Sequence, residues 1–313
     1  NATTSFAGVI SGSGGIEKRG TGGFTLTGAN SLTGRTLISA GSLTLAAGGS
    51  LAGTVMNTAT FNSSGTLTGL LTNEAGATAN LAGALNNVAI NRGTINLTGT
   101  TTGITDLTMA TGSVFNLGGF ATTVGTLAGG GGTVALGSAT LTLGSGTQSQ
   151  TFDGTITGTG GLTKIGANTF SLSGVQSYTG LTSVSGGTFI LGSNGALAGA
   201  LVNNATVSSN GLIAGLVTNN ATLVSTGALN GGLINAGGGN ASIRGTLAGA
   251  VNNAGTITLT GATTGIGALT QASTGSFVLG ANSTSIGSLA GSGAVRLANG
   301  AILTTGGNNA STS

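Results

Sequence analysis

The feature that most constrains this chain is that much of its sequence is written twice. Residues 6–45 return 146 positions later as residues 152–191, and the same offset still relates residues 70–73 to residues 216–219. Beyond that point the second copy has gained about one short unit. Repetition at this scale is typical of stacked folds in which each repeat contacts only its neighbours in the stack.

A shorter period is nested inside the long one. The segments 195–210, 211–226, 227–244 and 245–260 each begin with Gly and share one pattern, and the segments 49–64 and 65–80 correspond to them in the first copy. A short period within a long one is what a solenoid with one coil per about 16 to 20 residues produces.

Within each unit the sequence alternates between apolar and hydroxyl side chains over three to five positions, as in residues 42–45, 140–143 and 256–260. Gly and Asn interrupt these runs and supply corners, while the absence of Pro suits strands paired on both sides. We therefore predict an all-β fold, a right-handed parallel β-helix. One continuous solenoid over residues 1–313 with strands ~4.8 Å apart is expected to form a rod of about 80 Å.

Composition argues against catalysis and against nucleic-acid binding. The chain has 7 basic and 4 acidic residues, no His and no Cys, so its high isoelectric point reflects few charges and not a strong positive field. Its acidic residues, Glu17, Glu74, Asp106 and Asp153, fall in different predicted coils, where they cannot act as a general acid and base pair. We expect no enzymatic activity, no catalytic residues, no cofactor, no metal and no nucleic-acid partner.

Asparagine gives the sharpest polar signal, because it recurs at intervals of 16 residues within each copy. In register, these residues would form a ladder at a corner, with amides hydrogen-bonded along the stack. The alternative is a strip that binds a ligand. The predicted ladder residues are Asn57, Asn73, Asn203, Asn219 and Asn235.

Two further features of the sequence do not indicate a binding site. Lys18 and Arg19 form the only adjacent basic pair, which we interpret as part of a solvated loop, and only Lys18 has a basic counterpart in the second copy, Lys164. Thr-x-Thr motifs occur, but they are interrupted by Ala-Gly-Ala and Asn-Asn-Ala, which argues against a regular ice-binding face.

The two long repeats share a specific pattern: Phe, then Ile-x-Gly-x-Gly-Gly-Ile/Leu-x-Lys, Gly, Phe-x-Leu-x-Gly and Thr-Gly, ending in Gly-x-Leu/Phe-x-Leu. This pattern resembles the passenger-associated transport repeat of bacterial autotransporters (type V secretion), whose passengers are pertactin-like β-helices. The resemblance places repeat modules at residues 6–45 and 152–191, followed by short-coil solenoid at 46–151 and 192–313. The first module departs at Arg19 and Arg35, where the second has Ile165 and Leu181.

The resemblance implies a passenger domain exported through the outer membrane of a Gram-negative bacterium, with an extracellular location at the cell surface or in secreted form. The family is also expected to carry an N-terminal signal and a C-terminal outer-membrane β-barrel, and neither is in this chain. The repeat itself is expected to promote folding and secretion of the passenger.

Three functions remain open at this stage. The first is a surface adhesin or self-associating rod that binds a host-cell surface, a matrix receptor or its own copies, in host-cell attachment or virulence. The second is a released effector that engages a specific host-cell receptor through its least regular segments, 101–116 and 264–278. The third is a stalk and secretion module without binding activity of its own.

Overall fold

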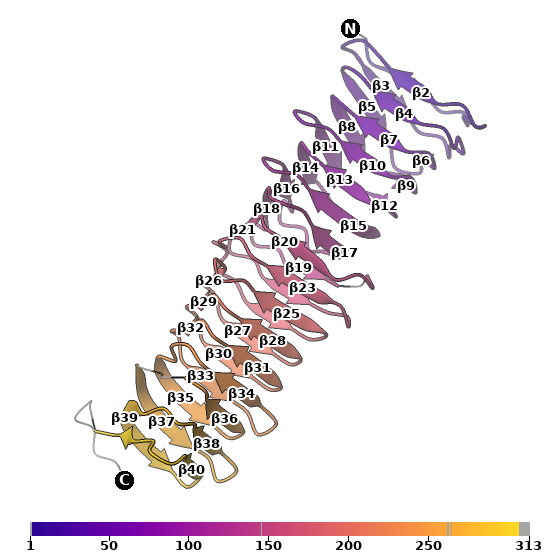
Figure 1. Cartoon of the computed structure of the whole chain (residues 1–313). Helices are drawn as coiled ribbons and strands as arrows, with labels where there is room; N and C mark the ends of the chain where they lie inside the picture. The colour runs from indigo at the N-terminus through magenta and orange to yellow at the C-terminus, as the bar shows by residue number, and fades with distance from the viewer. Residues whose placement is uncertain (1, 145, 262, 264, 307–313) are drawn as a thin grey trace. The chain divides into compact units, whose positions relative to one another are not determined.

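The computed structural model describes residues 2–144, 146–261, 263 and 265–306, and the chain divides into two compact units, Asn1–Gly160 and Gly161–Ser313. In each unit, short strands stack coil on coil with equivalent strands side by side (Figure 1). The paired strands are parallel, and the described residues contain no helix. The predicted all-β parallel solenoid is therefore confirmed for each unit, whereas a single continuous helix through both stays a prediction.

In the first unit, each regular coil contributes one strand to each of up to three sheets. The first sheet contains β2 (Ile16–Lys18), β4 (Thr36–Ile38), β7 (Val55–Asn57), β10 (Leu71–Asn73), β13 (Ala89–Asn91), β15 (Ile104–Met109), β17 (Thr122–Ala128) and β19 (Leu141–Leu143). The second sheet contains β1 (Thr4–Phe6), β3 (Gly23–Leu26), β5 (Ser42–Leu45), β8 (Thr60–Ser63), β11 (Thr78–Leu81), β14 (Thr94–Leu97), β16 (Val114–Asn116), β18 (Thr133–Ala135) and β21 (Thr155–Thr157). The third sheet contains β6 (Ser50–Leu51), β9 (Thr66–Leu67) and β12 (Ala84–Leu85), while β20 (Gln150–Phe152) forms a bridge from Phe152 to Gly129.

The second unit repeats this arrangement. Its first sheet contains β22 (Leu162–Lys164), β24 (Thr182–Val184), β27 (Leu201–Asn203), β30 (Val217–Asn219), β33 (Leu233–Asn235), β35 (Gly249–Asn253), β37 (Ile266–Gln271), β39 (Thr284–Gly291) and β41 (Leu303–Thr304). Its second sheet contains β23 (Thr169–Leu172), β25 (Thr188–Leu191), β28 (Thr206–Ser209), β31 (Thr222–Ser225), β34 (Asn240–Ile243), β36 (Thr256–Leu259), β38 (Ser276–Leu279) and β40 (Ala294–Leu297). Its third sheet contains β26 (Ala196–Leu197), β29 (Leu212–Ile213) and β32 (Ala228–Leu229).

The core of each unit is a narrow set of inward columns, because alternate side chains of every strand point inside. In the second sheet of the first unit, one such column runs through Leu43, Phe61, Ala79 and Ile95, each at most 1% exposed. The large ring of Phe61 lies beside the small Ala79 in the next coil. Alternation of large and small side chains fills a thin core without voids.

Glycine at the corners allows the backbones of successive coils to approach closely. A Cβ atom at Gly53 would lie 1.9 Å from the carbonyl oxygen of Gly34, which is a backbone atom and cannot move aside cheaply. Gly41 adopts a φ of 64°, a left-handed conformation that favours glycine. The corners therefore explain why a chain with this fold needs so much glycine.

At one buried position of the repeat, the two units differ in their side-chain hydrogen bonding. In the second unit, Tyr178 is 1% exposed and its hydroxyl lies 2.6 Å from the Thr182 Oγ1 atom. In the first unit, Leu32 takes the corresponding place, and the buried Thr36 Oγ1 has no hydrogen-bond partner among the described residues. Burial raises the pKa of the Tyr178 phenol above its ordinary value.

Tyr178 is the single tyrosine of the chain, so its ionisation can be followed by phenolate absorbance. An unfolded chain loses the phenol proton at about pH 10, whereas the folded chain keeps it at that pH. Stability is therefore unaffected below that pH and falls above it, by up to about 1.4 kcal/mol per pH unit. We expect phenolate absorbance to appear at alkaline pH only as circular dichroism reports unfolding, and Tyr178→Phe to weaken the alkaline loss of stability.

Two results would bear against this expectation. One is ionisation of the phenol at about pH 10 while the circular dichroism spectrum stays that of the folded chain, which would mean that the phenol is accessible to solvent. The other is an equal alkaline loss of stability in the Tyr178→Phe variant. At neutral pH the same variant should lose about 1 kcal/mol, because it leaves the Thr182 hydroxyl unpaired.

Candidate functional site

Carboxylates form two ion pairs on the surface, and Glu17, Lys18 and Arg19 also border one cavity near the start of the first unit. Arg19 lies 2.6 Å from Glu17, which also accepts a hydrogen bond of 2.9 Å from Ser39, and the Arg19 contact is the main cause that lowers the pKa of Glu17. Arg92 pairs with Glu74 at 3.0 Å. These are exposed pairs of the kind that contribute little to stability.

The remaining chemistry-bearing groups are equally dispersed. The carboxylate of Asp106 accepts a short hydrogen bond from Thr126 in the next coil. Across the residues that the structure describes, no three His, Cys, Asp or Glu side chains lie close enough together to hold a metal ion. The described part of the chain also contains no helical segment with the length and apolar character that a bilayer crossing requires.

The predicted asparagines of the first unit stack directly on one another in the first sheet. Asn57 and Asn73 are paired in register, and the Asn57 Nδ2 atom donates to the Asn73 Oδ1 atom at 2.7 Å. Asn73 then donates to Asn91 at 3.0 Å, and Asn91 contacts the sulfur of Met109 at 3.7 Å. This chain of amides runs along the stack inside the first unit.

The second unit holds a longer chain of the same kind. Asn203 donates to Asn219 at 2.7 Å, and Asn219 donates to Asn235 at 2.8 Å. The series continues from Asn235 to Asn253 at 2.8 Å and from Asn253 to Gln271 at 2.8 Å. We call these two series the buried amide columns.

Each asparagine amide also donates a second hydrogen bond, to a backbone carbonyl. The other Nδ2 hydrogen of Asn57 reaches the Thr78 carbonyl at 2.9 Å, and that of Asn203 reaches the Thr222 carbonyl at 2.7 Å. Each asparagine is the last residue of its strand with its side chain pointing inward, so the columns lie on the inner side of a corner. The predicted asparagines are at most 1% exposed, which leaves a ligand no access to them.

Sequence reasoning missed the members of the columns that follow a longer coil. Asn91, Asn253 and Gln271 each lie 18 residues after the preceding rung instead of 16. A search for a fixed interval passes over these positions, and Gln271 also changes residue type. The apolar-x-Asn pattern at the end of each strand is the signal that identifies Asn91 and Asn253.

The interpretation of the Lys18-Arg19 pair as solvated is confirmed for Arg19, which is exposed, and is wrong for Lys18. Lys18 is 8% exposed and Lys164 is 0% exposed, and both occupy the same inward position as the amide columns, two coils before the first Asn. The Lys18 Nζ atom donates to three carbonyls at 2.7 to 3.0 Å, and Lys164 donates to three at 2.5 to 3.3 Å. Burial lowers the pKa of Lys164.

The outer face of the second sheet in the first unit carries a second, solvent-facing set of ladders. Three consecutive strands present the motif Thr-x-Asn, and the Asn80 amide bonds to Asn62 at 2.8 Å while Asn96 bonds to Asn80 at 3.0 Å. These side chains are half-buried. We call this set the outer Thr/Asn face, and its members are Thr60, Asn62, Thr78, Asn80, Thr94 and Asn96.

In the second unit, the corresponding face keeps the threonine column but not the asparagine column. Thr188, Thr206 and Thr222 are stacked in register, whereas the neighbouring column alternates between serine and aliphatic side chains. Sequence copies with nearly the same interior therefore present different exteriors. That second column contains Ser171, Ile190, Ser208, Val224 and Ser242.

The segments proposed as irregular recognition loops are mostly regular. Residues 101–116 contain β15 and β16, and residues 264–278 contain β37 and β38, although residue 264 lies outside the described residues. The repeat looked irregular there because these first-sheet strands are six residues long instead of three. Their described non-strand residues are short connections, 101–103 and 110–113 in the first segment and 265 and 272–275 in the second.

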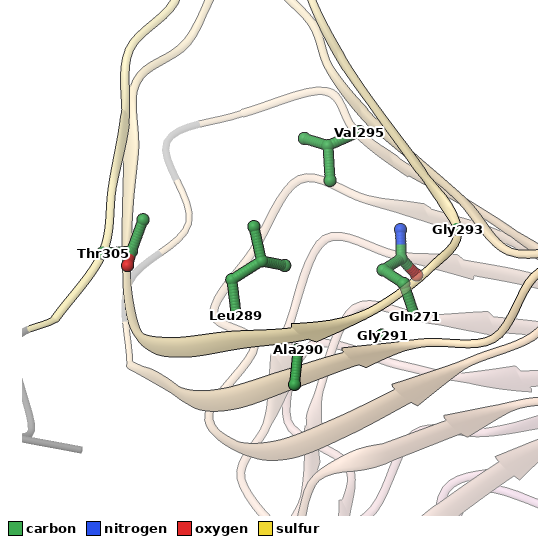
Figure 2. Close-up of a pocket in the computed structure, with 7 residues that line it drawn as sticks. All are labelled: Gln271, Leu289, Ala290, Gly291, Gly293, Val295 and Thr305. Carbon is green, nitrogen blue, oxygen red and sulfur yellow. The ribbon is translucent and has the colours of Figure 1, made fainter. Parts of the chain in front are cut away.

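One cavity of about 330 Å³ lies in the last coils of the second unit. Figure 2 shows Leu289, Val295 and the last rung of the amide column, Gln271, bordering it, with Thr305 on the opposite side and Ala290 pointing away. The Gln271 amide already donates to the Ala294 carbonyl at 2.9 Å. The lining combines aliphatic side chains, glycine backbone, the occupied Gln271 amide and the Thr305 hydroxyl, and it contains no ionisable side chain.

Two segments match a known family, the passenger-associated-transport-repeat, at residues 16–45 and 162–191. Both matches lie within the modules expected at 6–45 and 152–191. Each begins at the strand that holds the buried lysine. Neither the curated proteins nor the solved structures gave a match to this chain.

The buried amide column predicts a large stability effect at Asn219. Asn219→Ala removes hydrogen bonds to two buried neighbours, Asn203 and Asn235, and we expect a loss of about 2–3 kcal/mol. Asn220→Ala is the matched control, because Asn220 is the adjacent, exposed residue and should change stability by about 0.5 kcal/mol or less. Urea unfolding followed by circular dichroism measures both, and equal shifts would contradict a structural role for the column.

The buried lysine is expected to contribute through its three carbonyl partners. Lys164→Met keeps most of the side-chain volume but leaves those carbonyls without the ammonium donor, so we expect a loss of about 2–3 kcal/mol. Arg296→Met changes an exposed cation and should be nearly neutral. A stabilised Lys164→Met protein would mean that desolvation of the charge outweighs its hydrogen bonds.

Proposed function

We propose that this chain, which carries two passenger-associated transport repeats within parallel β-solenoids, is the passenger of an autotransporter and acts at the cell surface as an adhesin or self-associating rod. The transport repeats and the solenoid support an autotransporter passenger that is secreted or displayed. The more specific role in adhesion, host attachment and virulence is our proposal.

The observation that carries the adhesive role is the outer Thr/Asn face. Asn80 donates to Asn62 and accepts from Asn96 along the stack, and the amide hydrogens that these bonds leave over recur once per strand spacing of ~4.8 Å. The neighbouring threonine hydroxyls add a second row of donors and acceptors. Hydrogen bonds of this kind are individually weak, so binding would come from many contacts made at once.

The proposed partners are a host-cell surface, a matrix receptor or another copy of this chain, and we propose neither a nucleic-acid partner nor an enzymatic activity. Only 11 side chains of the 313 are charged, so long-range electrostatic attraction is a minor contribution. The effector alternative keeps its candidate segments, 101–116 and 264–278, although most of their described residues lie in strands. The stalk alternative predicts no adhesion from this chain at all.

Surface display tests the adhesive role. We expect the chain, displayed on a non-adherent Gram-negative strain through a β-barrel carrier, to cause settling of the culture or attachment to host cells or matrix. Introducing lysine together at Asn62, Asn80 and Asn96 should reduce this activity by about tenfold or more, because an effective loss of 1.4 kcal/mol already gives that factor.

The control introduces the same three charges on the second unit at Ala214, Asn230 and Thr246, which are exposed elsewhere. It should retain most of the activity. Display without any adhesion or settling would support the stalk alternative, and a saturable cell response to purified chain without adhesion would support the effector.

A further inference from the structure

The outer face of the first sheet in the second unit carries no charged side chain along four consecutive strands, β24, β27, β30 and β33. Two outward columns cross these strands. Backbone hydrogen bonds from Thr182 to Ala200, from Leu201 to Leu216 and from Val217 to Gly232, at 2.9, 2.9 and 3.2 Å, align the first column. That column contains Leu181, Ala200, Leu216 and Gly232, and the strand register aligns the second column as Ser183, Val202, Thr218 and Ile234.

Large and small side chains alternate across this face like the squares of a chequerboard. On the outer face each coil carries one large aliphatic residue. It lies in the first column just before β24 and β30, and in the second column within β27 and β33. Leu181, Leu216 and Ile234 are 48%, 40% and 36% exposed. We call these eight residues the chequered face.

The chequered face contains no charged residue, and its second column ends at polar residues on both sides. Thr163 precedes it in the second column and Asn252 follows it. In the first unit, the position of Leu181 is occupied by Arg35, so the uncharged face belongs to the second copy. Exposed large aliphatic side chains grouped on one uncharged face leave apolar area that an interaction can cover.

We propose that a second copy of this chain docks on the chequered face. A two-fold axis parallel to the stack of coils places the first column of one copy opposite the second column of the other. Leu181 then faces Ser183 of the second copy, and Leu216 faces Thr218 in the same way. The two remaining large residues likewise face small ones, so every large side chain enters a gap, as in closely packed sheets about 10 Å apart.

The size of the face determines how strong this association is. Four strands at ~4.8 Å and two columns bury on the order of 400 Å² in total, well below the ~1,200 Å² of a stable complex. The contact is therefore weak between dilute molecules and effective where many copies are held at high local concentration. In this respect the inference rests on the proposed surface display.

A lipid surface fits the face less well than a second copy. Peripheral membrane binding usually combines an apolar face with basic residues, and aromatic side chains anchor at the interface. The four strands of the chequered face carry neither on their outer side. The regular alternation of large and small side chains also matches a surface with the same strand spacing, which a fluid bilayer lacks.

Cysteine crosslinking of the purified full chain tests the proposal, because the natural sequence has no cysteine. Thr218→Cys places a thiol in the centre of the chequered face, and Thr258→Cys places one on the outer side of the second sheet with similar exposure. With a short dithiol-reactive crosslinker at high protein concentration, we expect a covalent dimer from the first variant and little from the second. Equal yields would overturn the proposal.

A second pair of variants separates the face from a general effect of charge. Leu216→Lys added to Thr218→Cys should lower the dimer yield by about tenfold or more, because it places an unpaired charge in an apolar contact. Val224→Lys is the matched control, since Val224 is 42% exposed on the second sheet, and should leave the yield unchanged. Equal effects of the two, with unchanged circular dichroism, would overturn the docking site.

Two further outcomes distinguish this inference from the proposed function. Retained host-cell attachment by displayed Leu216→Lys, with loss of crosslinking, supports the docking site and leaves the adhesin role standing. If Thr218→Cys gives no dimer but the chain sediments with lipid vesicles in a Leu216-dependent manner, a membrane and not a second copy occupies the face. Failure of crosslinking alone, with adhesion intact, overturns the docking site and not the adhesin.

Discussion

The parallel backbone hydrogen bonds between successive coils are the interaction on which the rest of each unit depends. They hold the Thr182 amide on the Ala200 carbonyl and the Leu201 amide on the Leu216 carbonyl, each at 2.9 Å. Equivalent residues therefore recur at the strand spacing, and any side chain can interact with its own kind in the next coil. Pro would interrupt this network wherever its missing N–H is needed, and the chain has none.

The buried amide columns oppose an error of strand register that such a repetitive sequence would otherwise tolerate. Alternating Thr and Leu over many strands would tolerate a slip by two residues, since the apolar side chains would still point inward. Such a slip would move Asn219 away from Asn203 and leave buried amides unpaired. The columns therefore specify the register, and the low dielectric of the core strengthens each bond within them.

The two units show that interior and exterior obey different constraints. Inside each unit, the column that holds the asparagines begins with a buried lysine. The next coil has Ile38 or Val184 at this position, and the following coils have asparagines. Outside, the first unit presents the outer Thr/Asn face and the second presents the chequered face. Packing and hydrogen bonding restrict the inward positions, whereas outward positions are free to differ and so are where binding specificity can arise.

By itself, the sequence determined the repeat, the parallel all-β solenoid and the equivalence of Asn57 with Asn73, because periodicity is a property of the chain alone. Only the tertiary structure decided that Lys164 lies inside, that Gln271 ends the second column and that Leu181 and Val202 share a face. Corner geometry and coil length set which way a side chain points and which residue lies above it. Coils of 16 and of 18 residues bring different sequence intervals to the same position, so no fixed interval reveals it.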